Sequence, residues 1–128
     1  MKPITREWVK KAEADLGTAK REFAVKVDPN YDAVCFHSQQ AAEKLLKARL
    51  QESEIAFARI HDLTILLDNV VNIEPAWENL RSQLHSLTAY AVEYRYPGES
   101  SGKSEAEEAL EICKTIRAAV RTSLGLRD

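Results

Sequence analysis

The chain has 128 residues, of which 45% are hydrophobic and 30% are charged, a balance that is typical of one globular domain and excludes a disordered chain. The formal net charge of −2 excludes a protein that coats nucleic acid through a general basic surplus, so any nucleic-acid contact must come from a local patch. There is no signal-peptide pattern at the start and no apolar run of the roughly 20 residues that cross a bilayer, and we therefore expect a cytoplasmic protein without membrane contact.

The first half of the chain predicts two long helices. Apolar residues at helical spacing predict a helix over residues 5–25, with Thr5 placed to cap its first turn. Asp28-Pro29-Asn30 interrupts this pattern, and a second helix is predicted over residues 29–53, with Asp28 as a possible cap. Its broad apolar face indicates a central helix that is packed on more than one side.

The second half predicts one short helix and two long ones. The short helix follows His61, and Asp62 is its expected N-cap. The next helix has Pro75 near its start and ends before Pro97-Gly98, a pair that fits a type II turn. The last helix begins near Ser104 and ends at Gly125. We therefore expect one all-α domain over residues 1–128, an up-and-down four-helix bundle with an additional short helix.

The second predicted helix carries an unusual polar face. Four side chains share it at spacings i, i+3, i+7 and i+10, namely His37, Gln40, Lys44 and Lys47. An imidazole, an amide and two ammonium groups could together hold a phosphate or a base edge. A solvated face, or a polar network that positions the neighbouring helix, explains the same spacing.

A second cluster closes the fourth long segment, where Tyr90, Tyr94, Arg95 and Tyr96 precede Pro97-Gly98. Tyr90 and Tyr94 are one helical turn apart and should stack on the same side. Arg95 lies at a helix end, where it can pair with the free carbonyls of the last turn. Alternatively, a guanidinium flanked by aromatic rings is well suited to phosphate and base contact.

The remaining candidates predict no metal site and no cofactor. The three histidines lie on separate segments without metal-ligand spacing, and His61 is expected to bond the backbone of its loop. Cys35 and Cys113 lie on apolar stripes and are expected to be buried thiols. The chain contains no glycine-rich phosphate loop and no nucleophile elbow.

In order and spacing, four segments between about Trp8 and Val120 resemble the HEPN family. The most specific of them contains the run Phe-His-x-Gln-Gln-Ala-Ala-Glu-Lys. The resemblance implies a four- or five-helix up-and-down bundle that commonly dimerises. The segments are Trp8…Lys11-Ala12…Asp15-Leu16, Cys35-Phe36-His37…Gln39-Gln40-Ala41-Ala42-Glu43-Lys44…Lys47-Ala48, His61-Asp62-Leu63…Leu66-Leu67 and Tyr94-Arg95-Tyr96-Pro97.

The resemblance also implies partners and a chemistry. HEPN proteins are often encoded beside a minimal nucleotidyltransferase, as a toxin–antitoxin pair or a split nucleotide-transfer system. Many cleave RNA with an arginine followed, after four to six residues, by a histidine at the dimer interface; others bind nucleotides or are non-catalytic helpers. Arg95 stands where the family places its arginine, but Ser100, Ser101 and Gly102 stand where the histidine is expected. The general base of the ribonuclease site is therefore missing.

We accordingly expect a homodimeric helical module that pairs with a minimal nucleotidyltransferase, binds nucleotide or RNA and is not catalytic alone. The residues expected to bind are Arg95, Tyr94, Tyr96, His37 and Lys44. One alternative is a toxin-type, metal-independent endoribonuclease with a degenerate Arg…His motif, in which Arg95 is catalytic. Another is a purely structural homodimer, whose polar helix face is an internal network. A shared fold does not choose among these functions.

Overall fold

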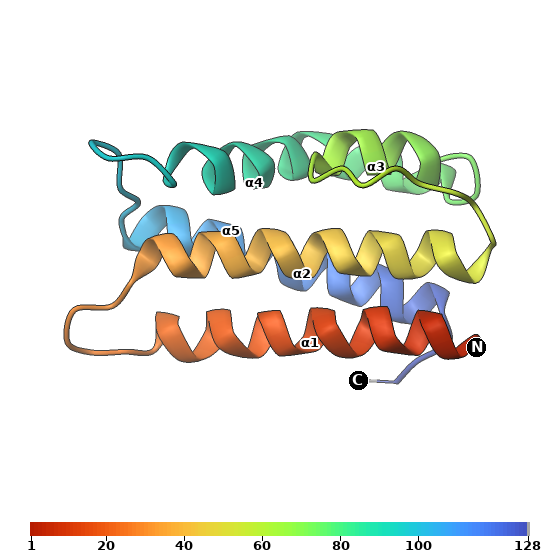
Figure 1. Ribbon diagram of the computed structural model, residues 1–128, viewed down its shortest axis with the longest axis horizontal. Helices are drawn as coiled ribbons and strands as arrows, with labels where there is room; N and C mark the ends of the chain where they lie inside the picture. The colour runs from red at the N-terminus through yellow and green to blue at the C-terminus, as the bar shows by residue number, and fades with distance from the viewer. Residues whose placement is uncertain (128) are drawn as a thin grey trace.

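The computed structural model describes residues 1–127, and in that part of the chain every regular element is helical (Figure 1). The all-α fold and the order of helices predicted from the sequence are confirmed. The elements are α1 (Pro3–Phe23), α2 (Tyr31–Glu52), α3 (Leu63–Val70), the 3-10 helix η1 (Pro75–Leu80), α4 (Arg81–Glu93) and α5 (Lys103–Ser123).

Helix α2 is the centre of the bundle and packs against all four other α-helices. In Figure 1 it lies between α1 on one side and the α3 and α4 layer on the other, with α5 behind. Three of its leucines, Leu45, Leu46 and Leu50, are fully buried. The broad apolar face that the sequence shows is therefore the surface on which the other helices are assembled.

The start of α1 differs from the prediction. Helix α1 begins at Pro3, which suits a first helical position because its missing N–H needs no partner there. Thr5 is thus inside the helix and fully buried, and the prediction that it caps the first turn is wrong. Its hydroxyl donates to Glu52 Oε1 at 2.9 Å, and the Lys2 N–H donates to the same oxygen at 3.0 Å. These bonds tie the start of α1 to the end of α2.

The caps of α2 and α3 test two further predictions. The cap of α2 is Asn30, whose Oδ1 accepts from the Ala33 N–H at 3.0 Å; the assignment to Asp28, which has φ of +49°, is wrong. The cap of α3 is Asp62, as predicted, and its Oδ1 accepts from the Thr64 N–H at 2.9 Å. An Asx side chain thus caps both of these helices.

The predicted fourth helix is two elements, because Pro75 begins a 3-10 segment that passes into α4 only at Arg81. The last helix begins one residue before the predicted Ser104. Its N-cap is Gly102, whose N–H donates to Glu105 Oε1 at 2.7 Å. Gly98, in the turn between these helices, has φ of +92°, a conformation that glycine adopts readily and that the predicted turn requires.

Both cysteines are buried and free, as predicted. Burial raises the pKa of the Cys35 thiol to about 11 and that of the Cys113 thiol to about 12. Both thiols are therefore protonated at neutral pH and act as small apolar groups of the core. Across residues 1–127, no helix combines the length and the apolar character that crossing a bilayer requires.

Candidate functional site

Arg95 lies just past the end of α4, at one end of the bundle. The helix ends at Glu93, and the N–H of its C-cap residue Tyr94 still donates to the Tyr90 carbonyl, so Arg95 lies in the turn that follows. The guanidinium carbon of Arg95 is 5.5 Å from the centroid of the Phe36 ring on α2, a cation–π distance. Arg95 is exposed and has no ion pair within residues 1–127, so its charge is available to a ligand.

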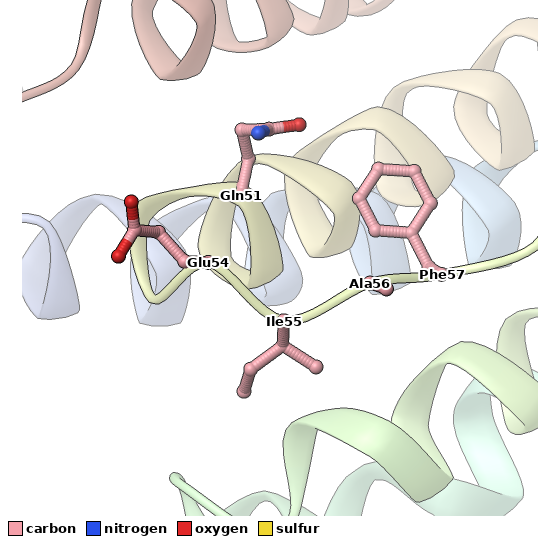
Figure 2. A pocket seen from close by; sticks show the side chains of 5 residues that line it. All are labelled: Gln51, Glu54, Ile55, Ala56 and Phe57. Atoms are coloured by element: carbon pink, nitrogen blue, oxygen red, sulfur yellow. The ribbon is translucent and has the colours of Figure 1, made fainter.

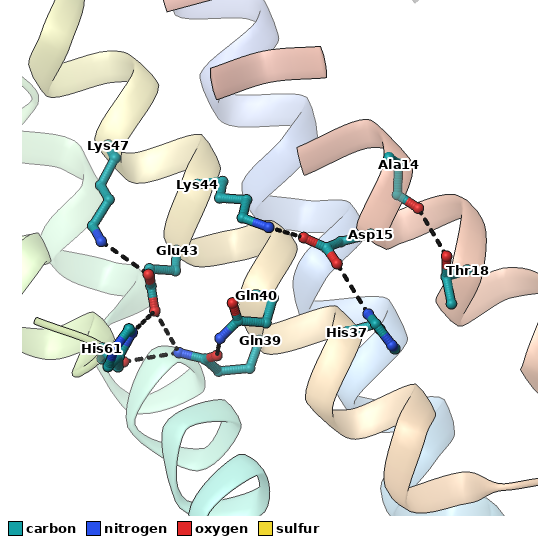
Figure 3. Close-up of polar contacts among 10 residues, drawn as sticks. All are labelled: Ala14, Asp15, Thr18, His37, Gln39, Gln40, Glu43, Lys44, Lys47 and His61. Atoms are coloured by element: carbon teal, nitrogen blue, oxygen red, sulfur yellow. Dashed lines mark hydrogen bonds and ion pairs between the residues drawn. The ribbon is translucent and has the colours of Figure 1, made fainter. Parts of the chain in front are cut away.

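His37 contacts the same aromatic ring. The His37 and Phe36 rings meet edge to face with centroids 5.2 Å apart. His37 Nδ1 lies 2.9 Å from Asp15 Oδ1 on α1, which fixes the Nδ1–H toward the carboxylate and leaves Nε2 outside this contact (Figure 3). Arg95 and His37, which are 58 positions apart in the sequence, are therefore brought to one phenyl ring.

Lys44 completes this group through Asp15. Its Nζ lies 2.5 Å from Asp15 Oδ2, so one carboxylate on α1 receives two groups from α2, the imidazole and the ammonium. Two cationic or donor groups on one partly buried carboxylate hold α1 and α2 in register. For His37 and Lys44, the geometry is thus a polar network between helices, the structural interpretation that the spacing left open.

The other two members of the predicted face belong to a different network on α2. Lys47 Nζ lies 2.9 Å from Glu43 Oε2, and His61 Nδ1 lies 3.0 Å from Glu43 Oε1. Gln40 donates to Gln39 Oε1 at 2.8 Å, and Gln39 in turn donates to the His61 carbonyl at 2.8 Å. Figure 3 shows this group and the Asp15 group on different sides of α2. The prediction that the His61 ring bonds its loop backbone is wrong, since the ring meets the Glu43 carboxylate.

The tyrosines around Arg95 have different surroundings. Tyr90 and Tyr94 stack as predicted, with centroids 6.0 Å apart and an interplanar angle of 25°. Tyr90 Oη donates to Glu108 Oε2 at 2.7 Å, and this bond, with partial burial, raises the pKa of Tyr90 to about 12. Tyr94 is half-buried against the core, whereas Tyr96 is 63% exposed. Of the three, Tyr96 is the ring that a ligand beside Arg95 can reach without rearrangement.

Two members of this site, Asp15 and Phe36, were assigned no role by sequence reasoning. Asp15 directly precedes the buried Leu16, so its position at the edge of the α1 stripe was the available signal for an interhelical carboxylate. Phe36 directly precedes the polar His37, and this position beside the polar face was the available signal that its ring borders the surface, where the structure leaves it partly buried. Neither signal identifies the partner, because the contacts join α2 to two other helices.

The site has the chemistry of an anion-binding surface more than that of a metal centre. Within residues 1–127, no three side chains of the His, Cys, Asp and Glu types gather as metal ligands. The Asp15 carboxylate is engaged by His37 and Lys44, and the free charge at the surface is that of Arg95. Arginine forms planar, bidentate hydrogen bonds with phosphate oxygens, which makes phosphate esters a suitable ligand class.

Comparison with known proteins places the chain in a family. The HEPN domain pattern matches residues 5–123. A Methanocaldococcus jannaschii protein named "Putative toxin MJ1304" is 32% identical, over 94% of this chain and 91% of that protein.

Two solved structures share the fold. TT1696 from Thermus thermophilus superposes with a TM-score of 0.80 and 28% identity, over 92% of this chain and 96% of that one. ST0689, described as an archaeal HEPN homologue, gives a TM-score of 0.76 and 28% identity, over 96% and 98% of the two chains. With the family pattern covering nearly its whole length, the chain belongs to the HEPN domain family.

Proposed function

We propose that this HEPN protein is the helical component of a toxin–antitoxin type pair, and that it binds phosphate groups of nucleotide or RNA at the surface formed by Arg95, Phe36 and Tyr96. The observation that carries the proposal is the position of Arg95. Its guanidinium is exposed, rests on an aromatic ring of α2 and has no carboxylate partner within residues 1–127.

The surroundings of Arg95 suit a nucleotide or a single RNA strand. The Tyr96 ring is exposed next to it in the chain, and bases stack on aromatic rings with about 1–3 kcal/mol per base. The His37 ring contacts the same Phe36 ring, and its Nε2 can accept a hydrogen bond from a 2′-hydroxyl group or, when the ring is protonated, donate one to a phosphate. The Lys44 ammonium is held by Asp15. It therefore contributes to binding through the positive electrostatic potential near His37 and not by direct contact with the ligand.

The binding test compares Arg95→Ala with Arg6→Ala, which removes an exposed arginine from α1. Fluorescence anisotropy with a labelled oligoribonucleotide, and calorimetry with ATP, give the affinities. Arg95→Ala should weaken binding at least tenfold while the melting temperature falls by only about 2–4 °C, because the exposed cation–π contact with Phe36 contributes about 0.5–1 kcal/mol. Arg6→Ala should match the wild type in both measurements. Equal affinity of Arg95→Ala and wild type would remove Arg95 from the site.

We further propose a homodimer and a nucleotidyltransferase partner. On α4, Ala89 and Val92 are exposed one helical turn apart, and the exposed Tyr96 follows just past the end of the helix, so apolar surface lies next to Arg95 in the chain. The toxin name of the archaeal relative supports a two-component system. Affinity purification of the tagged protein from its native cells, followed by mass spectrometry and light scattering, tests both. Recovery of a monomer without a nucleotidyltransferase would contradict them.

A second candidate function, RNA cleavage, is favoured by the Asp15–His37 pair. The carboxylate at 2.9 Å from Nδ1 orients the imidazole, the arrangement by which a carboxylate prepares a histidine for general base catalysis at Nε2. Because Arg95 lies on the neighbouring Phe36 ring, the pair stands where a displaced base could act on a phosphate bound by arginine. In this function, His37 would take the place of the histidine that is missing after Arg95.

Growth separates the two candidates. An active ribonuclease toxin expressed alone should arrest growth, and Arg95→Ala or His37→Ala should relieve the arrest. Asp15→Asn should relieve it only in part, because the imidazole remains but loses its orienting charge. Harmless high-level expression of the wild-type protein would reject the ribonuclease and leave the binding module.

A further inference from the structure

A separate cavity lies at the other end of α2, far from Arg95. Its volume is about 700 Å³, within the range of small-molecule sites, and its walls include Trp8, Lys47, Gln51, Phe57, Arg59 and His61. Lys47 follows Phe36 by 11 residues on the same helix, which corresponds to about 16 Å along the axis. The cavity is therefore distinct from the Arg95 surface, and what it binds is independent of the function proposed above.

Two aromatic rings from different elements form one side of the cavity. Trp8 of α1 and Phe57 of the connection after α2 meet edge to face, with centroids 6.1 Å apart. Figure 2 shows the Phe57 ring and the Gln51 side chain on the same side of this connection, while Ile55 points to the opposite side. Rings held edge to face offer two apolar surfaces at a steep angle to each other, and a planar ligand can stack on one while its edge meets the other.

Three basic side chains surround these rings, Lys47, His61 and Arg59, and the first two already have a partner. Lys47 Nζ lies 5.6 Å from the Trp8 ring centroid and 5.7 Å from that of Phe57, and it is paired with the buried Glu43. His61 is also bonded to Glu43. Arg59 is exposed and makes no hydrogen bond or ion pair within residues 1–127. Glu43 thus offsets the charge of Lys47, and Arg59 supplies an unpaired positive charge among the residues that line the cavity.

The polar groups of the cavity are mostly donors. The ammonium of Lys47, the guanidinium of Arg59 and the imidazole of His61 all offer N–H groups, whereas the Glu43 carboxylate is already occupied by three partners. In addition, the buried Trp8 Nε1–H has no hydrogen-bond partner within the described residues. A buried donor without an acceptor is unusual in folded proteins. The Lys47, Arg59 and His61 donors that line the cavity are complementary to an acceptor-rich, negatively charged ligand.

We propose that this cavity binds a small anion that carries a planar ring, with the ring against Trp8 and Phe57 and the anionic group on Arg59 and His61. The anionic group can be a phosphate, as in a mononucleotide, or a carboxylate, as in an aromatic acid. Both present acceptor oxygens to a guanidinium and a flat apolar body to the rings.

The test uses the single-tryptophan variant Trp77→Phe, which leaves Trp8 as the only tryptophan and places the fluorescent reporter in the cavity wall. Four probes are titrated into the full chain and followed by Trp8 fluorescence and calorimetry: AMP, benzoate, adenosine and inorganic phosphate. We expect AMP or benzoate to bind with Kd of about 1 mM or below, and adenosine and phosphate at least tenfold more weakly. Preference for AMP assigns the phosphate source, and preference for benzoate assigns the carboxylate source.

Variants then locate the ligand. Arg59→Ala should weaken binding at least tenfold, and Arg59→Lys should restore part of it. Arg6→Ala and Arg95→Ala each remove an arginine elsewhere and should leave the Trp8 response unchanged. Binding that Arg95→Ala abolishes while Arg59→Ala leaves it intact would overturn the proposal, and so would the absence of binding for both ring-bearing anions. Equal binding of phosphate and AMP would also overturn it, because the rings would then contribute nothing.

Discussion

The two polar networks of α2 use the same residue types and have different surroundings. Lys44 and His37 share Asp15 across the α1–α2 contact, where the carboxylate and the lysine side chain are 14% and 23% exposed. Lys47 and His61 share Glu43, where the corresponding side chains of Lys47 and Glu43 are only 7% and 4% exposed. The two lysines are three positions apart in sequence. The sequence spacing therefore determines on which side of the helix a charged side chain lies. The packing of the neighbouring segments determines how strongly water screens the ion pair that this side chain makes.

The largest effect is expected from removing the charge of Glu43. In Glu43→Gln, the buried Lys47 ammonium loses its counterion, and the free energy of unfolding should fall by about 3 kcal/mol. Denaturant unfolding followed by circular dichroism measures the change. The double variant Glu43→Leu/Lys47→Met is the control, because apolar side chains of similar size remove both charges together. It should recover much of the loss. An equal loss in single and double variants would mean that the charge balance is not the cause.

A smaller effect is expected from the matching change in the other network. Asp15→Asn removes the charge that receives Lys44 and His37, but water reaches both groups, so unfolding should be easier by only about 1 kcal/mol. The same denaturant experiment in high salt should reduce the difference between Asp15→Asn and wild type, because salt screens partly exposed pairs. If Asp15→Asn lowered the free energy of unfolding as much as Glu43→Gln, the different burial of the two networks would not explain their contributions to stability.

The cap beside His61 offers a control for the Glu43 network that involves no ion pair. Asp62→Ala removes the N-cap of α3 and should cost about 1 kcal/mol, whereas Asp62→Asn should keep most of the stability because an amide oxygen also caps. The Thr64 hydroxyl and N–H hold the pKa of Asp62 below its usual value of 3.8. Its contribution is therefore fully present above pH 4 and is lost as the pH falls below that value. Thermal melts of the three proteins between pH 7 and 2.5 test this sign.

The smallest stability effect concerns the Arg95 end. Tyr90→Phe removes the bond to Glu108 at an exposed position and should cost about 0.5 kcal/mol or less. Because the folded pKa of Tyr90 is raised to about 12, its contribution is present below pH 10 and is lost as the pH rises through 12. Ultraviolet titration of the tyrosinates should show a group that ionises near pH 12 and is absent in Tyr90→Phe. Ionisation of all tyrosines near pH 10 would contradict the hydrogen bond.

Helical content, element order and the central place of α2 could be predicted from apolar periodicity alone. The residues responsible are strongly patterned, and no segment alternates with period two. The ends of the helices were harder to predict from the sequence. Thr5 and Asp28 are both suitable caps by type, yet Pro3 and Asn30 define the actual starts, because several candidate caps lie within a few residues of each other.

Residue order alone was enough to establish an all-helical bundle, the buried thiols, and the placing of His37, Lys44 and Lys47 on a single helix. Their division into two networks, the ring that carries Arg95 and the cavity beside Trp8 depend on how the helices pack in three dimensions. The reason is physical: helical spacing is a local property of consecutive residues, whereas an ion pair, a cation–π contact or a cavity wall joins residues from different helices. Asp15, Phe36 and Phe57 acquire their roles from those neighbours.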